Sequence, residues 1–163
     1  MKRLRILGIC GVFVMFGTVA AQAPGTHTNI ADAKREYAAV FSHPDKPCSG
    51  KDADSTFDFE SCMDKELDFL APHLEAFVKA MRGMATDSEE PPEARGSYPS
   101  VLDSFNKTDA SWRSYRDNFC RLASSWDNGS ELSAADSMQC AYEMDRAYVK
   151  DLAHWADLSI LAD

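Results

Sequence analysis

Apolar residues spaced at alternating steps of four and three along two long stretches constrain the fold of this chain most strongly. Such spacing places the side chains on one face of an α-helix. The first stretch carries Met63, Leu67, Leu70, Leu74, Phe77, Met81 and Met84, and the second carries Phe105, Thr108, Trp112, Tyr115, Phe119, Leu122 and Trp126. No stretch shows the two-residue alternation of a half-buried strand. We therefore predict an all-α fold that buries both stripes.

Proline, glycine and capping residues set the expected ends of the first two helices. A short N-terminal helix over residues 30–40 begins after Thr28 or Asn29 as its N-cap and ends near the first of two prolines. The second helix ends at Gly83 and the proline-rich stretch 86–99. Pro72 lies inside this second helix and should kink or divide it, because proline lacks an amide hydrogen.

Two more helices complete the predicted fold. The third spans about residues 100–126, and the fourth begins near Ser133, where Ser-x-x-Asp resembles a capping box. The expected inner face of the fourth helix carries Met138, Ala141, Tyr148, Leu152 and Trp155. Three long amphipathic helices and one short one predict a small antiparallel helical hairpin or bundle.

An N-terminal export signal is indicated by the first residues of the chain. Lys2, Arg3 and Arg5 precede an apolar run over residues 6–16 and a series of small residues ending at Ala21. The run is shorter than the roughly 20 residues that cross a bilayer. We expect cleavage after Ala21, so that residues 1–21 are removed and the mature chain is periplasmic or secreted, without a membrane span.

Four cysteines remain outside the predicted signal: Cys48, Cys62, Cys120 and Cys140. An even count in an exported chain favours disulfides, and the absence of a C-x-x-C pair argues against zinc and against a redox motif. Four cysteines allow three connectivities. We favour Cys48 with Cys62 and Cys120 with Cys140, because each pair closes a short segment next to a predicted helix end.

Length and charge narrow the class of protein further. Removing residues 1–21 leaves about 140 residues, which we divide into an N-terminal extension over 22–47 and a helical domain over 48–163. That mature chain holds 14 basic and 26 acidic residues, a net charge of −12. Nucleic acid is therefore excluded as a partner, since phosphate binding needs a basic surface, whereas a cationic protein would be attracted.

Motifs for catalysis or cofactor binding are missing from the sequence. It contains no G-x-S-x-G, H-E-x-x-H or phosphate-binding glycine loop, and the four histidines share no ligand spacing. The K-D-A-D-S-T-F-D stretch resembles a calcium loop but has Phe57 where glycine is needed and Met63 where a glutamate is needed. We predict no catalytic residue, metal or cofactor. An enzyme using Glu60, Asp64 and Glu66 would require these carboxylates to meet in a cleft.

The run Ser111-Trp-Arg-Ser-Tyr-Arg-Asp-Asn-Phe-Cys120 is the most specific local feature. We expect Trp112 and Tyr115 to face inward with Phe119, and Arg116 and Asp117 to lie beside that stripe. In one interpretation the aromatic residues are core and the two charged residues form ion pairs. In the other, part of the run reaches the surface and binds a partner, because Trp, Tyr and Arg dominate binding hot spots.

At these residues the chain resembles the lysozyme-inhibitor LprI-like domain of bacterial exported proteins. The W-x-x-Y-R-D-x-x-C pattern carries Trp112, Tyr115, Arg116, Asp117 and Cys120, with a Gly-Ser turn and a further cysteine after it. The other two cysteines match the family in order, and the resemblance spans about residues 48–152. It implies a small helical domain in the periplasm or at the cell surface, with some members inhibiting lysozyme.

The function we expect is that of a non-enzymatic binding protein, namely a lysozyme inhibitor that covers the cleft of a cationic wall-degrading enzyme. The alternative is a periplasmic interaction or toxin-immunity protein without lysozyme inhibition. The exposed candidates for binding are the polar loop 43–56 and the acidic loop 86–99.

Overall fold

The computed structural model describes residues 24–49, 54–126 and 133–156, with side chains from Thr28 onward. Its helices are α1 (Pro24–Ser42), α2 (Thr56–Asp87), α3 (Pro92–Arg95), α4 (Val101–Trp126) and α5 (Ser133–Trp155). No strand occurs in these three described ranges, so the all-α prediction is confirmed. The predicted signal over residues 1–21 lies outside them.

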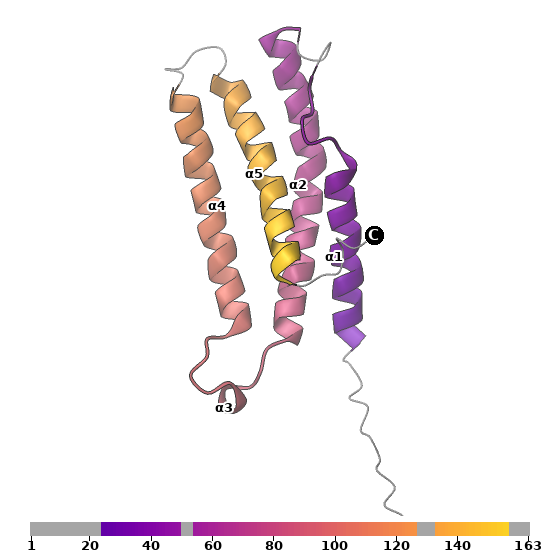
Figure 1. The fold of residues 1–163 in the computed structure, drawn as a ribbon, viewed down its shortest axis with the longest axis vertical. Helices are drawn as coiled ribbons and strands as arrows, with labels where there is room; N and C mark the ends of the chain where they lie inside the picture. Colours follow the sequence, from indigo (N-terminus) through magenta and orange to yellow (C-terminus); the bar gives the residue numbers. More distant parts are fainter. Residues whose placement is uncertain (1–23, 50–53, 127–132, 157–163) are drawn as a thin grey trace, which may run out of the picture.

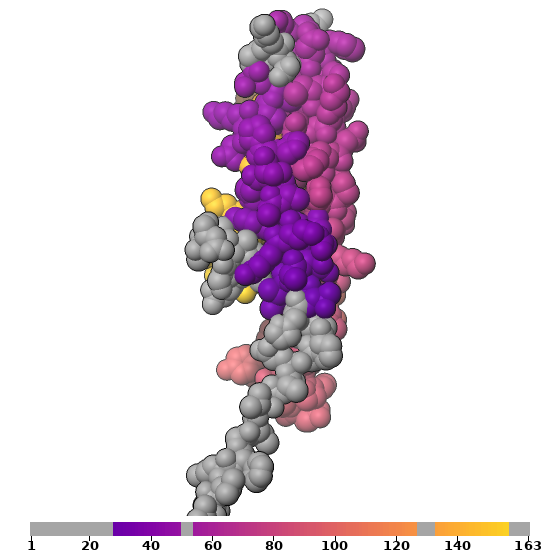
Figure 2. Space-filling model, turned by 90° about the vertical axis from the view of Figure 1, so that its right-hand side faces the viewer, coloured from indigo at the N-terminus to yellow at the C-terminus, as the bar shows by residue number. Residues whose placement is uncertain are grey.

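The four long helices lie side by side in the order α4, α5, α2 and α1, so that α4 and α1 occupy opposite edges (Figure 1). Helices α4 and α5 run antiparallel, and so do α1 and α2 (Figure 1). The chain therefore reverses its direction from one long helix to the next. Seen from the α1 side, α1 lies along α2 (Figure 2). The first helix was predicted to be short, but α1 spans 19 residues because its helical conformation begins at Pro24.

Helix α2 begins at a complete N-cap and continues past both of its predicted breaks. The Ser55 hydroxyl oxygen accepts a hydrogen bond from the Asp58 amide at 3.1 Å, which satisfies one of the free donors of the first turn. The helix does not divide at Pro72, which is exposed on its outer side. Leu70 and Leu74 are buried on the opposite face, and their packing holds both halves of α2 in line.

Gly83 lies within α2 and does not end it, contrary to the prediction from sequence. The reason is its contact with α1. A Cβ atom at this position would lie 2.6 Å from side-chain atoms of Asn29, so the missing side chain makes room for the neighbouring helix. The Asn29 amide also donates a hydrogen bond to the Asp87 carboxylate at 3.0 Å. Gly83 therefore permits close packing of α1 against α2, whereas the sequence pattern had indicated a helix end at this residue.

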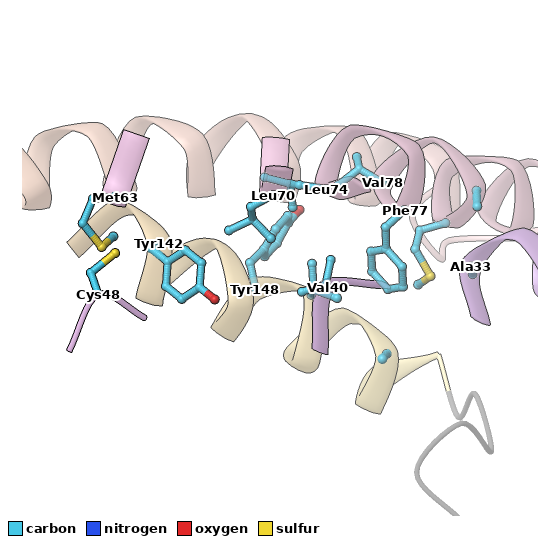
Figure 3. Close-up of a cluster of buried hydrophobic side chains, with 14 residues drawn as sticks. Ala33, Val40, Cys48, Met63, Leu70, Leu74, Phe77, Val78, Tyr142 and Tyr148 are labelled. Atoms are coloured by element: carbon cyan, nitrogen blue, oxygen red, sulfur yellow. The ribbon is translucent and has the colours of Figure 1, made fainter. Parts of the chain in front are cut away.

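The hydrophobic core lies between α1, α2 and α5. Side chains of α2 reach toward Val40 of α1 and toward Tyr142 and Tyr148 of α5 (Figure 3). The buried residues of α2 are Met63, Leu70, Leu74, Phe77, Val78, Ala80, Met81 and Ala85, which confirms most of the predicted stripe. Each large apolar side chain that is fully buried contributes roughly 1.5–3 kcal/mol. By contrast, Asp109 and Cys120 are the buried residues of α4.

Two disulfides join the helices, and their pairing is the one favoured from sequence. Cys48 bonds Cys62 with an S–S distance of 2.07 Å, and Cys120 bonds Cys140 at 2.06 Å. The first bridge fastens the segment after α1 to the start of α2. The second joins α4 directly to α5, its antiparallel neighbour.

Arg146 of α5 fastens the end of α1 to the core. Its buried guanidinium donates hydrogen bonds to the carbonyl oxygens of Val40 and His43, both at 2.9 Å, and to the Tyr142 hydroxyl at 3.0 Å. It also pairs with the Asp45 carboxylate at 2.5 Å. The last carbonyl groups of a helix have no partner within it, and Arg146 supplies one from another helix.

Candidate functional site

Helix α4 faces the rest of the bundle with a charged seam centred on Asp109. This buried carboxylate accepts hydrogen bonds from Arg82 of α2, from Arg113 of its own helix and from the Tyr148 hydroxyl of α5, each at 3.2 Å. Burial, followed by the negative charge of Asp109, raises the pKa of Tyr148, so the phenol stays protonated and donates. The Arg113 guanidinium also donates two hydrogen bonds to the Glu75 carboxylate, at 2.6 and 3.1 Å. The seam thus ties three helices together.

Trp112 and Arg116, from the run singled out in the sequence, belong to the same seam. Trp112 is partly buried and stacks on Tyr148, and the Arg116 guanidinium lies 5.9 Å from the Trp112 ring centroid. Arg116 also donates to Asp145 at 3.1 Å. Burial raises the pKa of the Asp145 carboxyl to about 6, because the nearby guanidinium offsets only part of the cost of desolvating the charge. These residues hold α4 against α5.

The other half of the predicted inner stripe of α4 faces solvent, which corrects the sequence prediction. Tyr115 is 58% exposed, Phe119 45%, Leu122 51% and Trp126 77%. Helix α4 lies at an edge of the bundle, and its inward positions are taken by the charged seam and by Cys120. The periodicity identified one face of the helix correctly but not the side on which that face lies. Trp155, predicted to line α5, is likewise 84% exposed.

These residues are called here the α4 apolar face: Val101, Tyr115, Phe119, Leu122 and Trp126. The last four adjoin one another, and Val101 lies at the start of the helix. Their spacing places them along one side of the helix, and the rings of Tyr115 and Phe119 lie 5.6 Å apart. Near Val101 the face adjoins an open hollow of about 430 Å³. That hollow is lined chiefly by apolar side chains from three helices, including Met81, Phe105, Leu152 and Trp155.

Helix α2 presents a contrasting surface, the α2 acidic face, defined by Asp64, Asp68 and Glu75. All three are exposed and lie on one side of the helix. In the described part of the chain, neither Asp64 nor Asp68 has an ion-pair partner, although like charges four residues apart destabilise a helix by a few tenths of a kcal/mol. Helix α2 has seven acidic and three basic residues, a net charge of −4, whereas α4 has three acidic and four basic residues, a net charge of +1.

The other site residues considered in the sequence analysis either contact a neighbouring side chain or lie apart from one another. Asp117 is exposed and lies 3.4 Å from Arg116. Glu66 shares a hydrogen bond of 2.6 Å with His43. Asp64 points to solvent, so it and Glu66 do not meet in a shared cleft. The described residues contain no group of three His, Cys, Asp or Glu side chains placed to hold a metal ion.

Both loops proposed as binding surfaces form contacts with the helices or within the loop in the residues that the structure describes. In the first loop, Asp45 pairs with Arg146 and Cys48 is bridged to α2, while residues 50–53 lie outside the described ranges. In the second loop, Glu89 pairs with Arg95 and accepts a hydrogen bond from the Leu102 amide at 3.0 Å. The stretch 86–99 also contains the end of α2 and all of α3. These contacts fix the conformation of the loops, although most residues of the second loop remain exposed.

No protein family model matches the chain, and neither a curated protein nor a solved structure matches it. What the structure defines is an all-α bundle with two disulfides, an exposed apolar helix at one edge and an acidic helix face. Within the described ranges, none of the helices has both the length and the apolar character needed to traverse a bilayer.

Proposed function

We propose that this chain is an exported, non-enzymatic binding protein that inhibits a cationic wall hydrolase such as lysozyme by covering its cleft. The α2 acidic face is the observation that carries the proposal. The resemblance of Trp112–Cys120 and of the cysteine order to LprI-like domains supplies the choice of lysozyme. Export is supported by the basic and apolar N-terminus together with the two disulfides, which persist in oxidising compartments.

Charge would guide the two proteins together. A mature charge of −12 raises the rate at which a cationic protein meets this one, and Asp64 and Asp68 of the α2 acidic face present two exposed carboxylates without ion-pair partners in the described residues. Asp64 and Asp68 are retained four residues apart at a small cost in helix stability, which a role in binding would explain. The Cys48–Cys62 bridge and the core beneath α2 keep the face rigid, so little conformational entropy is lost on binding.

The test is the rate of cell-wall hydrolysis by lysozyme with increasing amounts of the oxidised mature protein. We expect inhibition at low salt that weakens as salt is added, because salt screens exposed charges. Asp64→Asn with Asp68→Asn should weaken inhibition. The matched control, Asp103→Asn with Asp151→Asn, changes the net charge equally at exposed sites on other helices and should leave most of the inhibition intact.

Unchanged hydrolysis at tens of micromolar protein and low salt would overturn the inhibitor proposal. Capture of a different envelope protein under those conditions would instead favour the interaction or immunity role expected as the alternative. Equal effects of the two double variants would show that overall charge, and not the α2 acidic face, governs the encounter.

A further inference from the structure

We propose that the α4 apolar face is where two copies of this chain pair. The proposal does not depend on lysozyme inhibition, because it concerns the opposite edge of the bundle from α1 and a different helix from the α2 acidic face (Figure 1). It rests on the exposure of this face, the way α4 is anchored and the net charge of α4.

The exposed apolar area of the α4 apolar face is large for a monomeric protein. Soluble monomers rarely expose contiguous apolar patches larger than a few hundred Å². Taking roughly 150–250 Å² for a fully buried aromatic side chain, the exposed parts of Tyr115, Phe119 and Trp126, together with Trp155 of α5 beside the hollow, supply ~500 Å² per copy. A standard interface buries roughly 800 Å² per partner. Leu122, Val101 and the adjoining hollow supply much of the difference.

The chain cannot cover the face by turning α4 inward. Rotation of the helix would break the Cys120–Cys140 bridge and would move Asp109 away from its donors on α2 and α5. A buried carboxylate without partners costs several kcal/mol. The same contacts hold the face in one orientation, so that a partner meets a preformed surface.

Charge favours a second copy as the partner over a cationic protein. The chain is strongly acidic as a whole, so two copies repel each other across most of their surfaces. Helix α4, with a net charge of +1, is where that repulsion is weakest, and it is also where a cationic partner would be attracted least.

The experiment is sedimentation velocity of the oxidised mature protein over micromolar to hundreds of micromolar concentration, with circular dichroism as a check on folding. We expect a concentration-dependent dimer. Phe119→Glu should yield a monomer with unchanged helicity, because this side chain is exposed and its loss opens no core cavity. The control Phe57→Glu, at another exposed aromatic residue on α2, should still dimerise.

A monomer at every concentration would overturn the proposal. Dimers that survive Phe119→Glu would also overturn it, and so would loss of the dimer in the control Phe57→Glu with unchanged helicity.

Discussion

The Trp112 ring of α4 lies flat on the Tyr148 ring of α5, with centroids 4.0 Å apart and an angle of 6° between the planes. Tyr148 also donates its hydroxyl hydrogen to Asp109, three residues before Trp112 in α4. The stack and the hydrogen bond together fix how α4 is rotated about its own axis. That rotation directs the charged seam inward and the aromatic residues outward.

Tyr148→Phe should separate the two parts of this contact. The variant keeps the stack but removes one of three hydrogen bonds to the buried Asp109, so we expect a loss of about 1–2 kcal/mol in the free energy of unfolding. Trp112→Ala removes the stack and should cost about 2–3 kcal/mol. Urea denaturation measures both. Tyr98→Phe, at an exposed site, is the control, and a Tyr148→Phe value no larger than the control value would contradict the proposed role.

Removing the second disulfide should loosen α4 selectively. The bridge closes a segment with a sequence separation of 20, and its loss through Cys120→Ser with Cys140→Ser should cost about 3 kcal/mol. Because α4 contributes so little to the core, its backbone amides should exchange hydrogen faster, while those of α2 should keep most of their protection. Equal loss of protection in α2 and α4 would show that the bundle opens only as a unit.

Asp145 should make stability depend on pH in a defined direction. Its folded-state pKa of about 6 lies above the unfolded value near 3.8, so between these values the folded protein binds more protons than the unfolded one. Stability from this group is therefore full below about pH 4 and is lost as the pH rises through 6. Asp145→Asn removes the dependence. The stability difference, parent minus variant, should fall by about 1–3 kcal/mol from pH 4 to pH 7, as measured by denaturation.

The control for this pH experiment is a substitution at an exposed carboxylate. Asp151→Asn removes a nearby exposed carboxylate and should leave the parent's dependence on pH unchanged. A difference between parent and Asp145→Asn that stays constant from pH 4 to pH 7 would mean that Arg116 compensates the buried charge fully.

Gly83→Ala tests the close approach of α1 and α2. Alanine favours a helix interior by about 1 kcal/mol over glycine, but its methyl group would meet the Asn29 side chain and disturb the Asn29 hydrogen bond to Asp87. In the parent these effects should nearly cancel. In an Asn29→Ala background the substitution should stabilise the protein by about 0.5–1 kcal/mol. Identical effects in both backgrounds, measured by thermal denaturation, would show that the Asn29 side chain does not restrict the size of the residue at position 83.

The sequence predicted α2 and the disulfides well because local signals agree with the fold there. Residues such as Leu70 and Phe77 fall on the buried face, as their spacing indicated. Gly83 misled the prediction because a glycine that ends a helix and one that admits a neighbouring helix look alike in sequence. Pro72 did so because an exposed proline can be held within a helix by core packing on its other side.

The orientation of α4 was beyond prediction for a different reason. Periodicity reveals that apolar residues share a face, but only the neighbouring helices decide whether that face is buried. Here Asp109 finds donors on two other helices, and these contacts between distant parts of the chain turn Tyr115 and Phe119 outward. The signal available in the sequence was that Asp109, Arg113 and Arg116 recur at helical spacing beside the stripe.

The contacts of Arg146 determine when α1 can reach its final packing as the protein folds. The residue that completes the end of α1 lies more than 100 positions further along the chain, in the last helix. During synthesis, the N-terminal helix must therefore wait for almost the whole polypeptide before its final contacts exist. A fragment ending before residue 133 would leave α1 and α2 as an unfinished pair, so interrupted synthesis should give a product that proteases recognise readily.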